Sequence, residues 1–81
     1  MKIKILFFAT LRDYVGAKTI ELEIPHDTTV AGLKELLVKR YPKMIPAQNS
    51  IMAAINREFA ADEQVISLDA EIALFPPVSG G

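Results

Sequence analysis

The sequence predicts an α+β fold in which one main helix packs on one face of a mixed sheet of four to five strands. Residues 2–8 and 19–24 alternate apolar and other side chains, residues 30–41 have helical spacing, and short apolar segments follow. A chain of 81 residues has room for a single hydrophobic core. We therefore expect one domain over residues 1–75 and an extended tail over residues 76–81.

The first two predicted strands form a hairpin. Residues 2–8 alternate as on a strand with one buried face, and residues 19–24 alternate in the same way up to Pro25. The stretch between them, residues 12–17, has the composition of a turn, and Gly16 is its expected site of positive φ. A hairpin closed by a turn is therefore expected.

The middle of the chain changes to helical spacing. One apolar face is formed by Val30, Leu33, Leu37 and Tyr41. Either Thr28 or Thr29 can cap the start of this helix, and Pro42 ends it. The basic residues expected on its solvent-exposed face are Lys34, Lys39 and Arg40.

The second half of the chain returns to strands after a loop with two prolines. Residues 51–55 predict a third strand, a brief extended piece follows around Phe59, and residues 71–75 predict the last strand. Turn compositions at residues 56–58 and 67–70 separate them. In a roll built in this order the first and last strands lie side by side at the centre, which is the β-grasp, or ubiquitin-like, arrangement.

The composition excludes several classes of function. The chain has no cysteine, so neither a disulfide nor a thiolate metal site can form, and its single histidine, His26, cannot make a histidine-rich metal centre. A net charge of −1 argues against nucleic acid or an anionic membrane as partner. No apolar run approaches the ~20 residues that span a bilayer, and no signal-peptide pattern is present, so a cytoplasmic location is expected.

The tail carries the strongest functional signal. After the last strand it reads Pro76-Pro77-Val78-Ser79-Gly80-Gly81. The two prolines restrict φ and favour an extended course, so the tail is expected to reach ~20 Å from the sheet. The two glycines have no side chain, so a narrow channel can approach them closely. The Gly81 carboxylate is therefore the expected reactive group of the chain. The alternative is that Gly80-Gly81 is only a flexible end without chemistry.

Alternation also predicts an exposed aromatic patch. If Phe7 faces the helix, Phe8 points to the opposite face, and the same argument sends Phe75 outward on the last strand. Phe8 and Phe75 would then meet at the root of the tail, and Phe59 would extend the patch. Burial in the core is the alternative, since it is the commoner fate of phenylalanine. Arg12 in the first turn is a candidate to pair with a carboxylate of a partner protein. The alternative is that it is an exposed turn residue with no such role.

Several motifs together resemble the MoaD family, the small subunits of molybdopterin synthase. The matching motifs are Leu6-Phe7-Phe8-Ala9, Arg12, Val15-Gly16, Ala54-Ile55-Asn56 and Phe75-Pro76-Pro77-Val78-Ser79-Gly80-Gly81. The last motif is much more specific than a bare Gly-Gly, and the resemblance covers the whole chain. The related thiamin sulfur carriers of the ThiS type also end in Gly-Gly but are usually shorter and lack Phe-Pro-Pro.

The resemblance implies a sulfur carrier that works as a subunit of the synthase and is not catalytic alone. An E1-like, MoeB-like enzyme would use ATP and magnesium to adenylate Gly81, and a sulfur donor protein would convert it to a thiocarboxylate. The tail would then deliver sulfur to cyclic pyranopterin monophosphate in a MoaE-like large subunit. Pro76-Pro77 would aim the tail, Val78 and Ser79 would contact the channel wall, and Gly80 would allow access. The chain itself would bind no cofactor tightly and no metal.

Three other interpretations keep the fold. The chain can be a sulfur carrier for thiazole synthesis or another acceptor, or a ubiquitin-like modifier conjugated to lysines. It can also be a ubiquitin-like binding domain with no chemistry at its end. Deletion of Gly81 separates this last interpretation from the others, since a pure binding domain does not depend on its terminal carboxylate.

Overall fold

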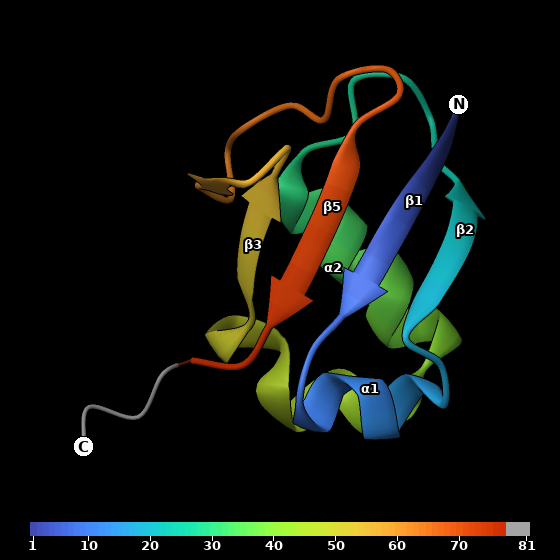
Figure 1. Cartoon of the computed structure of the whole chain (residues 1–81), viewed down its shortest axis with the longest axis vertical. Coiled ribbons are helices and arrows are strands. Elements are labelled where there is room, and N and C mark those ends of the chain that lie inside the picture. The colour runs from blue at the N-terminus through green and yellow to red at the C-terminus, as the bar shows by residue number, and fades with distance from the viewer. Residues whose placement is uncertain (78–81) are drawn as a thin grey trace.

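The computed structural model describes residues 1–77 and shows the expected α+β arrangement. In chain order the elements are β1 (Lys2–Phe7), α1 (Thr10–Val15), β2 (Thr19–Glu23), α2 (Val30–Arg40), the 3-10 helix η1 (Pro42–Ser50), β3 (Met52–Ile55), β4 (Glu58–Ala60) and β5 (Glu71–Phe75). The strands form one five-stranded sheet in the order β2-β1-β5-β3-β4. Helix α2 crosses one face of the sheet, and α1 lies at the end where β1 and β5 finish (Figure 1).

The hydrophobic core lies between the sheet and α2. At the centre of the sheet β1 runs parallel to β5, with Ile5 opposite Ile72, and β2 is antiparallel to β1 on its other side. Alternation along these strands turns every second side chain toward the helix. The strand residues buried in this way are Ile3, Ile5, Phe7, Ile72 and Leu74. The helix residues that complete the core with them are Val30, Leu33 and Leu37. The predicted buried faces are confirmed.

Helix α2 begins and ends where the sequence predicts. The Thr29 hydroxyl accepts a hydrogen bond from the backbone N–H of Gly32 at 3.1 Å, so Thr29, and not Thr28, is the N-cap. The helix ends at Arg40, two residues before Pro42. Proline has no N–H to donate and restricts the residue before it, so the helical hydrogen bonding stops there.

The expected turn between β1 and β2 is wrong in part, because Thr10–Val15 forms the short helix α1. Leu11 is fully buried, and Val15, one turn later, packs against the core. This apolar pair stabilises a helix that the turn-type residues around Arg12 conceal in the sequence. Gly16 ends the helix at a φ of 81° and donates its N–H to the Arg12 carbonyl at 2.8 Å, so the predicted positive φ is confirmed.

The loop expected after α2 is also regular. Pro42–Ser50 forms the 3-10 helix η1, with Pro42 at its start, where a missing N–H removes no helical hydrogen bond. Met44 is fully buried and anchors this segment to the core, and η1 packs along α2 and against α1. The proline content of the segment indicated a loop but gave no sign of the buried methionine contact.

A buried charge ties α2 to the sheet. Lys34 is expected on the solvent-exposed face of α2 but is only 8% exposed. Its ammonium donates to the Ile51 carbonyl at 2.7 Å and to Oδ1 of Asp62 at 2.8 Å. Ile51 directly precedes β3 and Asp62 follows β4, so both lie at the open end of the β3–β4 hairpin. Lys34 therefore holds the two chain segments at this open end against the helix. Burial of the ammonium is tolerated because both contacts are hydrogen bonds, one of them to a carboxylate.

Lys34→Met removes the ammonium while keeping most of the side-chain length. We expect this variant to lose about 1–3 kcal/mol of the free energy of unfolding, because the buried Ile51 carbonyl loses its donor. Lys39→Met on the exposed side of α2 is the matched control and is expected within about 0.5 kcal/mol of wild type. Urea denaturation measures both values, and equal stability of the two variants contradicts the role assigned to Lys34.

Candidate docking surface at the root of the tail

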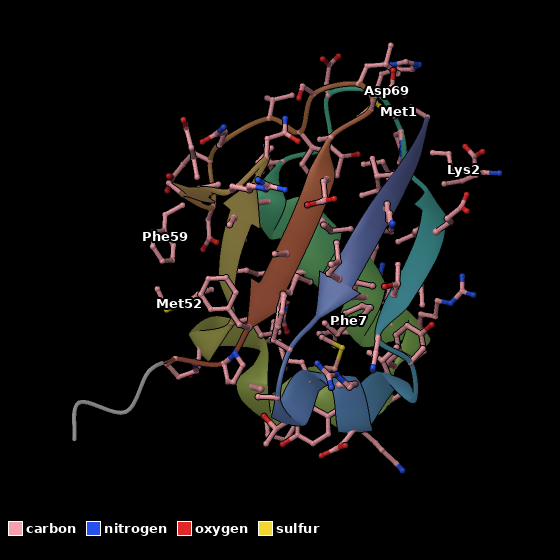
Figure 2. The ribbon with its side chains drawn as sticks, viewed as in Figure 1. Met1, Lys2, Phe7, Met52, Phe59 and Asp69 are labelled. Carbon is pink, nitrogen blue, oxygen red and sulfur yellow. The ribbon has the colours of Figure 1, made fainter. Side chains whose placement is uncertain are left out.

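The sheet face opposite α2 is divided into an apolar half and a charged half. Strand residues that alternate with the buried ones point to this outer face. Toward the end of β5 they are Leu6, Met52, Ala54, Phe59, Ala73 and Phe75, and Phe8 joins them directly after β1. Toward the start of β1 they are Lys2, Lys4, Glu21, Glu23 and Glu71. The apolar half therefore lies where β5 leads into the tail, and Figure 2 shows Phe59 and Met52 on the β3–β4 side, away from Lys2.

Three phenylalanines, Phe8, Phe59 and Phe75, form the centre of the apolar half and are called the aromatic surface below. The Phe75 ring lies 6.4 Å from that of Phe8 and 5.7 Å from that of Phe59, centroid to centroid, in both cases edge to face. Phe8 is 41% and Phe59 is 73% exposed. The structure thus brings together the three aromatic residues that the sequence placed in one patch, and their contact with a partner stays a prediction.

Strand register explains how Phe8 reaches Phe75. The backbone N–H of Phe8 donates to the Leu74 carbonyl at 3.0 Å, so the ladder between the two central strands continues one residue beyond β1. This hydrogen bond holds Phe8 beside the last residue of β5. On the other side of β5, Met52 pairs with Phe75 and adds a flexible apolar side chain to the surface. The sequence did not identify Met52, because its position depends on the pairing of β3 with β5.

Small residues explain how Phe59 reaches Phe75 across β3. Ala54 lies opposite Phe59 on one side and opposite Ala73 on the other. Two alanines leave space above the sheet, so the Phe59 ring can lean over β3 to contact Phe75. A larger side chain at Ala54 would fill this space and separate the two rings.

The charged half of the outer face is solvated. Lys2 and Glu21 form an ion pair with 3.8 Å between Nζ and Oε2, and both side chains are more than half exposed. An exposed pair of this kind contributes little to stability. Charges on β2 instead protect an edge strand from unwanted pairing, because β2 is the outermost strand on this side of the sheet.

The described part of the tail is short. β5 ends at Phe75, as predicted, and Pro76 and Pro77 follow it without further strand pairing. The remaining predicted tail residues, Val78, Ser79, Gly80 and Gly81, lie outside the described residues. The extended course of the tail and the role of its last glycines therefore stay predictions.

Arg12 occupies a different environment from the one expected. It lies on helix α1 and is half-buried, whereas the sequence suggested an exposed turn. Its Nε donates to the carbonyl of Phe7 at 3.4 Å, a long hydrogen bond at the end of β1. The guanidinium thus lies next to the strand end that carries Phe8, and pairing of Arg12 with a partner's carboxylate stays a prediction.

The part of the chain that the structure describes has neither a metal-binding cluster nor a membrane-spanning helix. Among residues 1–77 there is no group of three or more histidine or acidic side chains placed to hold a metal ion. None of the helices in that same stretch has the length and apolar character needed to cross a membrane. His26 lies in an exposed turn before α2. The aromatic surface is accordingly the candidate site that the geometry supports best.

A sequence model described as the ThiS family matches residues 5–81. The chain belongs to the ThiS family. Curated relatives of this ThiS family member include the molybdopterin synthase sulfur carrier subunits of Haemophilus influenzae and Arabidopsis thaliana. The Haemophilus protein is 35% identical over 98% of this chain and 99% of its own. The Arabidopsis protein is 30% identical over 100% of this chain and 84% of its own. The resemblance to the MoaD and ThiS carriers is confirmed.

Solved structures of similar fold confirm the ubiquitin-like β-grasp arrangement. SAMP1 from Haloferax volcanii superimposes on this ThiS family member with a TM-score of 0.84, at 29% identity, over 100% of both chains. A complex of subunits 1 and 2 of molybdopterin-converting factor from Helicobacter pylori contains a chain that matches with a TM-score of 0.68, over 100% of both chains. The identity in that second case is 16%, so it shows the fold alone.

Phe59→Ala and Phe7→Ala test the assignment of faces. Phe59 is mostly exposed, so its truncation is expected to change the free energy of unfolding by less than about 1 kcal/mol. Phe7, which precedes Phe8 in the chain, is on the opposite face and is only 1% exposed. Its truncation is expected to lower the free energy of unfolding by about 3–5 kcal/mol. Urea denaturation compares the two, and a loss at Phe59 as large as that at Phe7 would place the Phe59 ring in the core.

Proposed function

We propose that this chain is the sulfur-carrier subunit of a molybdopterin synthase. The observation that carries the proposal is the aromatic surface at the end of β5, the strand from which the Pro-Pro-Val-Ser-Gly-Gly tail continues. An exposed apolar surface of this kind is typical of a protein interface. A partner that covers it lies next to the strand that delivers the tail. The relatives named as sulfur carrier subunits support the same function.

The partner proposed for the aromatic surface is a MoaE-like large subunit. Aromatic side chains are enriched at protein interfaces, and buried aromatic anchors often carry much of the binding energy. Phe8, Phe59 and Phe75 would supply such anchors, and Arg12 is a candidate for an additional polar contact. That a neighbour of the same fold was solved in a complex of subunits 1 and 2 supports a partner of this class.

Gly81 is the proposed carrier of sulfur. A carboxylate is a poor acyl donor, since its charge and resonance resist nucleophilic attack, so it must first be activated. On an E1-like, MoeB-like enzyme the Gly81 carboxylate attacks the α-phosphorus of ATP, with magnesium bound there, and pyrophosphate leaves. A thiol reductant releases hydrosulfide from the persulfide of a donor protein, with the thiol oxidised to a disulfide. The hydrosulfide then attacks the acyl carbon of the adenylate, AMP leaves, and a thiocarboxylate results. ATP and magnesium thus belong to the activating enzyme.

Sulfur delivery takes place in the pocket of the large subunit. The tail enters that pocket, and the thiocarboxylate sulfur attacks a carbon of cyclic pyranopterin monophosphate, from which an oxygen substituent leaves. Water then cleaves the acyl–sulfur bond, so the sulfur stays on the pterin and Gly81 returns to a carboxylate. Two deliveries build the dithiolene. Val78 and Ser79 contact the channel wall, and Gly80 keeps the tail narrow at the reacting end. The absence of cysteine from the sequence supports this route, because no side-chain thiol is present to carry the sulfur. The cycle is proposed for the cytoplasm.

A second candidate, a ubiquitin-like protein modifier, is favoured by the match to SAMP1. That protein is a small archaeal modifier by name and matches this chain along its whole length. The two functions share adenylation of the terminal carboxylate and differ in the acceptor. A modifier ends in an isopeptide bond to lysine, whereas a carrier returns with a free carboxylate after sulfur delivery. A carrier for thiazole synthesis differs from both in its acceptor and is supported by the family name alone.

Incubation with the activating enzyme, ATP, magnesium and a sulfur source tests the proposal. We expect intact-mass spectrometry to show one oxygen-to-sulfur exchange, confined to the C-terminal peptide, because only the Gly81 carboxylate is activated. Addition of the large subunit and cyclic pyranopterin monophosphate should then restore the original mass and produce molybdopterin.

Deletion of Gly81 is the matched control. The deletion lies outside the core elements, so the variant should unfold at the same urea concentration as wild type but fail to acquire sulfur. Molybdopterin formation by the deletion variant would refute the proposed role of Gly81. Stable lysine conjugates with no thiocarboxylate would favour the modifier function instead.

A further inference from the structure

We propose that the partner reaches beyond the aromatic surface into a groove at the β4 edge of the sheet. This edge groove is lined by Met52, Phe59 and Ala60 on its apolar side and by Lys34, Asn49 and Asp62 on its polar side. Its occupant is an extended segment of the large subunit that carries an apolar side chain and, near it, a lysine or arginine. The inference rests on the proposed function and deepens it, since it assigns a second contact region to the same interface.

The edge groove is continuous with the aromatic surface. It has a volume of about 440 Å³, and Phe59 and Met52 line it as well as belonging to the apolar outer face. In Figure 2 both labelled side chains lie at the β3–β4 side of the sheet. A second hollow of about 330 Å³ shares Lys34, Asn49 and Asp62 with the groove and extends it toward α2. A chain that covers Phe75 can therefore continue around the sheet edge without leaving the surface.

The exposure of Phe59 favours such a continuation. The Phe59 ring contacts Phe75 in the aromatic surface, and the same residue lines the edge groove. At 73% it is the most exposed of the large hydrophobic residues in the described part of the chain. A partner that lay flat on the aromatic surface would cover only the side near Phe75. Complete burial of the ring, as expected for an aromatic anchor, needs an apolar group in the groove as well.

The charges of the groove favour a basic residue near the apolar one. The Lys34 ammonium is already hydrogen-bonded to the Ile51 carbonyl and to Asp62, so it is not available to an acidic partner without loss of those bonds. The Asp62 side chain is 57% exposed, and Glu35 on α2 lines the adjoining hollow and is exposed. Carboxylates therefore face solvent where the groove approaches α2, and a lysine or arginine is complementary to them.

The walls of the groove are held in place before any partner binds. The N–H of Ala31 donates to the Asp62 carbonyl at 3.0 Å, and the N–H of Val30 donates to the Gln64 carbonyl at 2.9 Å. These bonds join the first turn of α2 to the segment after β4, and the Lys34 contacts join the same helix to the start of β3. Because little ordering is needed on binding, a preformed groove favours affinity.

Substitution of one groove residue and its neighbour tests the inference. Asn49 and Ser50 are adjacent exposed residues of η1, but only Asn49 lines the groove. We expect Asn49→Trp to weaken binding to the large subunit about tenfold or more, because the indole fills the groove. Ser50→Trp is expected to change the dissociation constant less than about twofold. Calorimetry measures the affinity, and circular dichroism confirms that both variants are folded.

A charge pair tests the chemistry of the occupant. Glu35→Lys should weaken binding at low salt and lose much of that effect at high salt, because it repels the basic residue. Glu21→Lys, with the same change in net charge, lies on β2 at the opposite edge of the sheet and should have little effect.

Phe75→Ala separates the two proposals. If it weakens binding while Asn49→Trp does not, the large subunit docks on the aromatic surface alone, and the edge groove inference is wrong. If the wild-type chain does not bind the large subunit at all, the proposed function is wrong, and this inference with it. Tighter binding of Glu35→Lys would show that the groove takes an acidic segment, which also overturns the proposal.

Discussion

The parallel pairing of β1 with β5 is the interaction on which the rest of the structure depends. It joins the first and last strands at the centre of the sheet, with Leu6 opposite Ala73 and Phe7 opposite Leu74. Two neighbouring strands in this register bury the same face against α2 and expose the same opposite face. The pairing therefore produces the core and the outer apolar surface together, and it brings the end of β5 beside the end of β1, where Phe8 lies.

The second consequence is the division of the outer face. The charged half keeps β2 and the start of β1 in water, while the apolar half leaves three phenylalanine rings near the end of β5. Complete burial of an exposed phenylalanine side chain contributes about 1.5–3 kcal/mol. Phe8 and Phe75 are already partly covered, so a partner gains part of that value at these rings and most of it at Phe59. An interface at this position holds the partner beside the strand from which the tail continues, which is the arrangement that a carrier needs.

Sequence patterns predicted the parts of this fold that rest on local periodicity. The bounds of β5, the end of α2 before Pro42 and the outward direction of Phe8 all follow from spacing within a single element. Helix α1 was missed because its stability comes from a tertiary contact, the burial of Leu11, which a short segment with turn-type residues does not reveal.

Features that depend on distant segments were beyond sequence reasoning. The sequence predicts Lys34 on the solvent-exposed face of α2. Its ammonium has hydrogen-bond partners only because the fold packs α2 against Ile51 and Asp62. The edge groove arises in the same way, from β4, η1 and α2, which no periodicity connects. By contrast, Gly80 and Gly81 were singled out by motif alone, and the role proposed for them rests on chemistry and not on the fold.

Amide hydrogen exchange of the chain, alone and with the large subunit, locates the docking surface. We expect protection on binding to be concentrated around Phe8, Met52, Phe59 and Phe75. No change is expected along β2 around Glu21 or on the exposed side of α2 around Lys39. Protection confined to β2 or to the exposed side of α2, with the aromatic residues unchanged, would show that the partner does not dock on the aromatic surface.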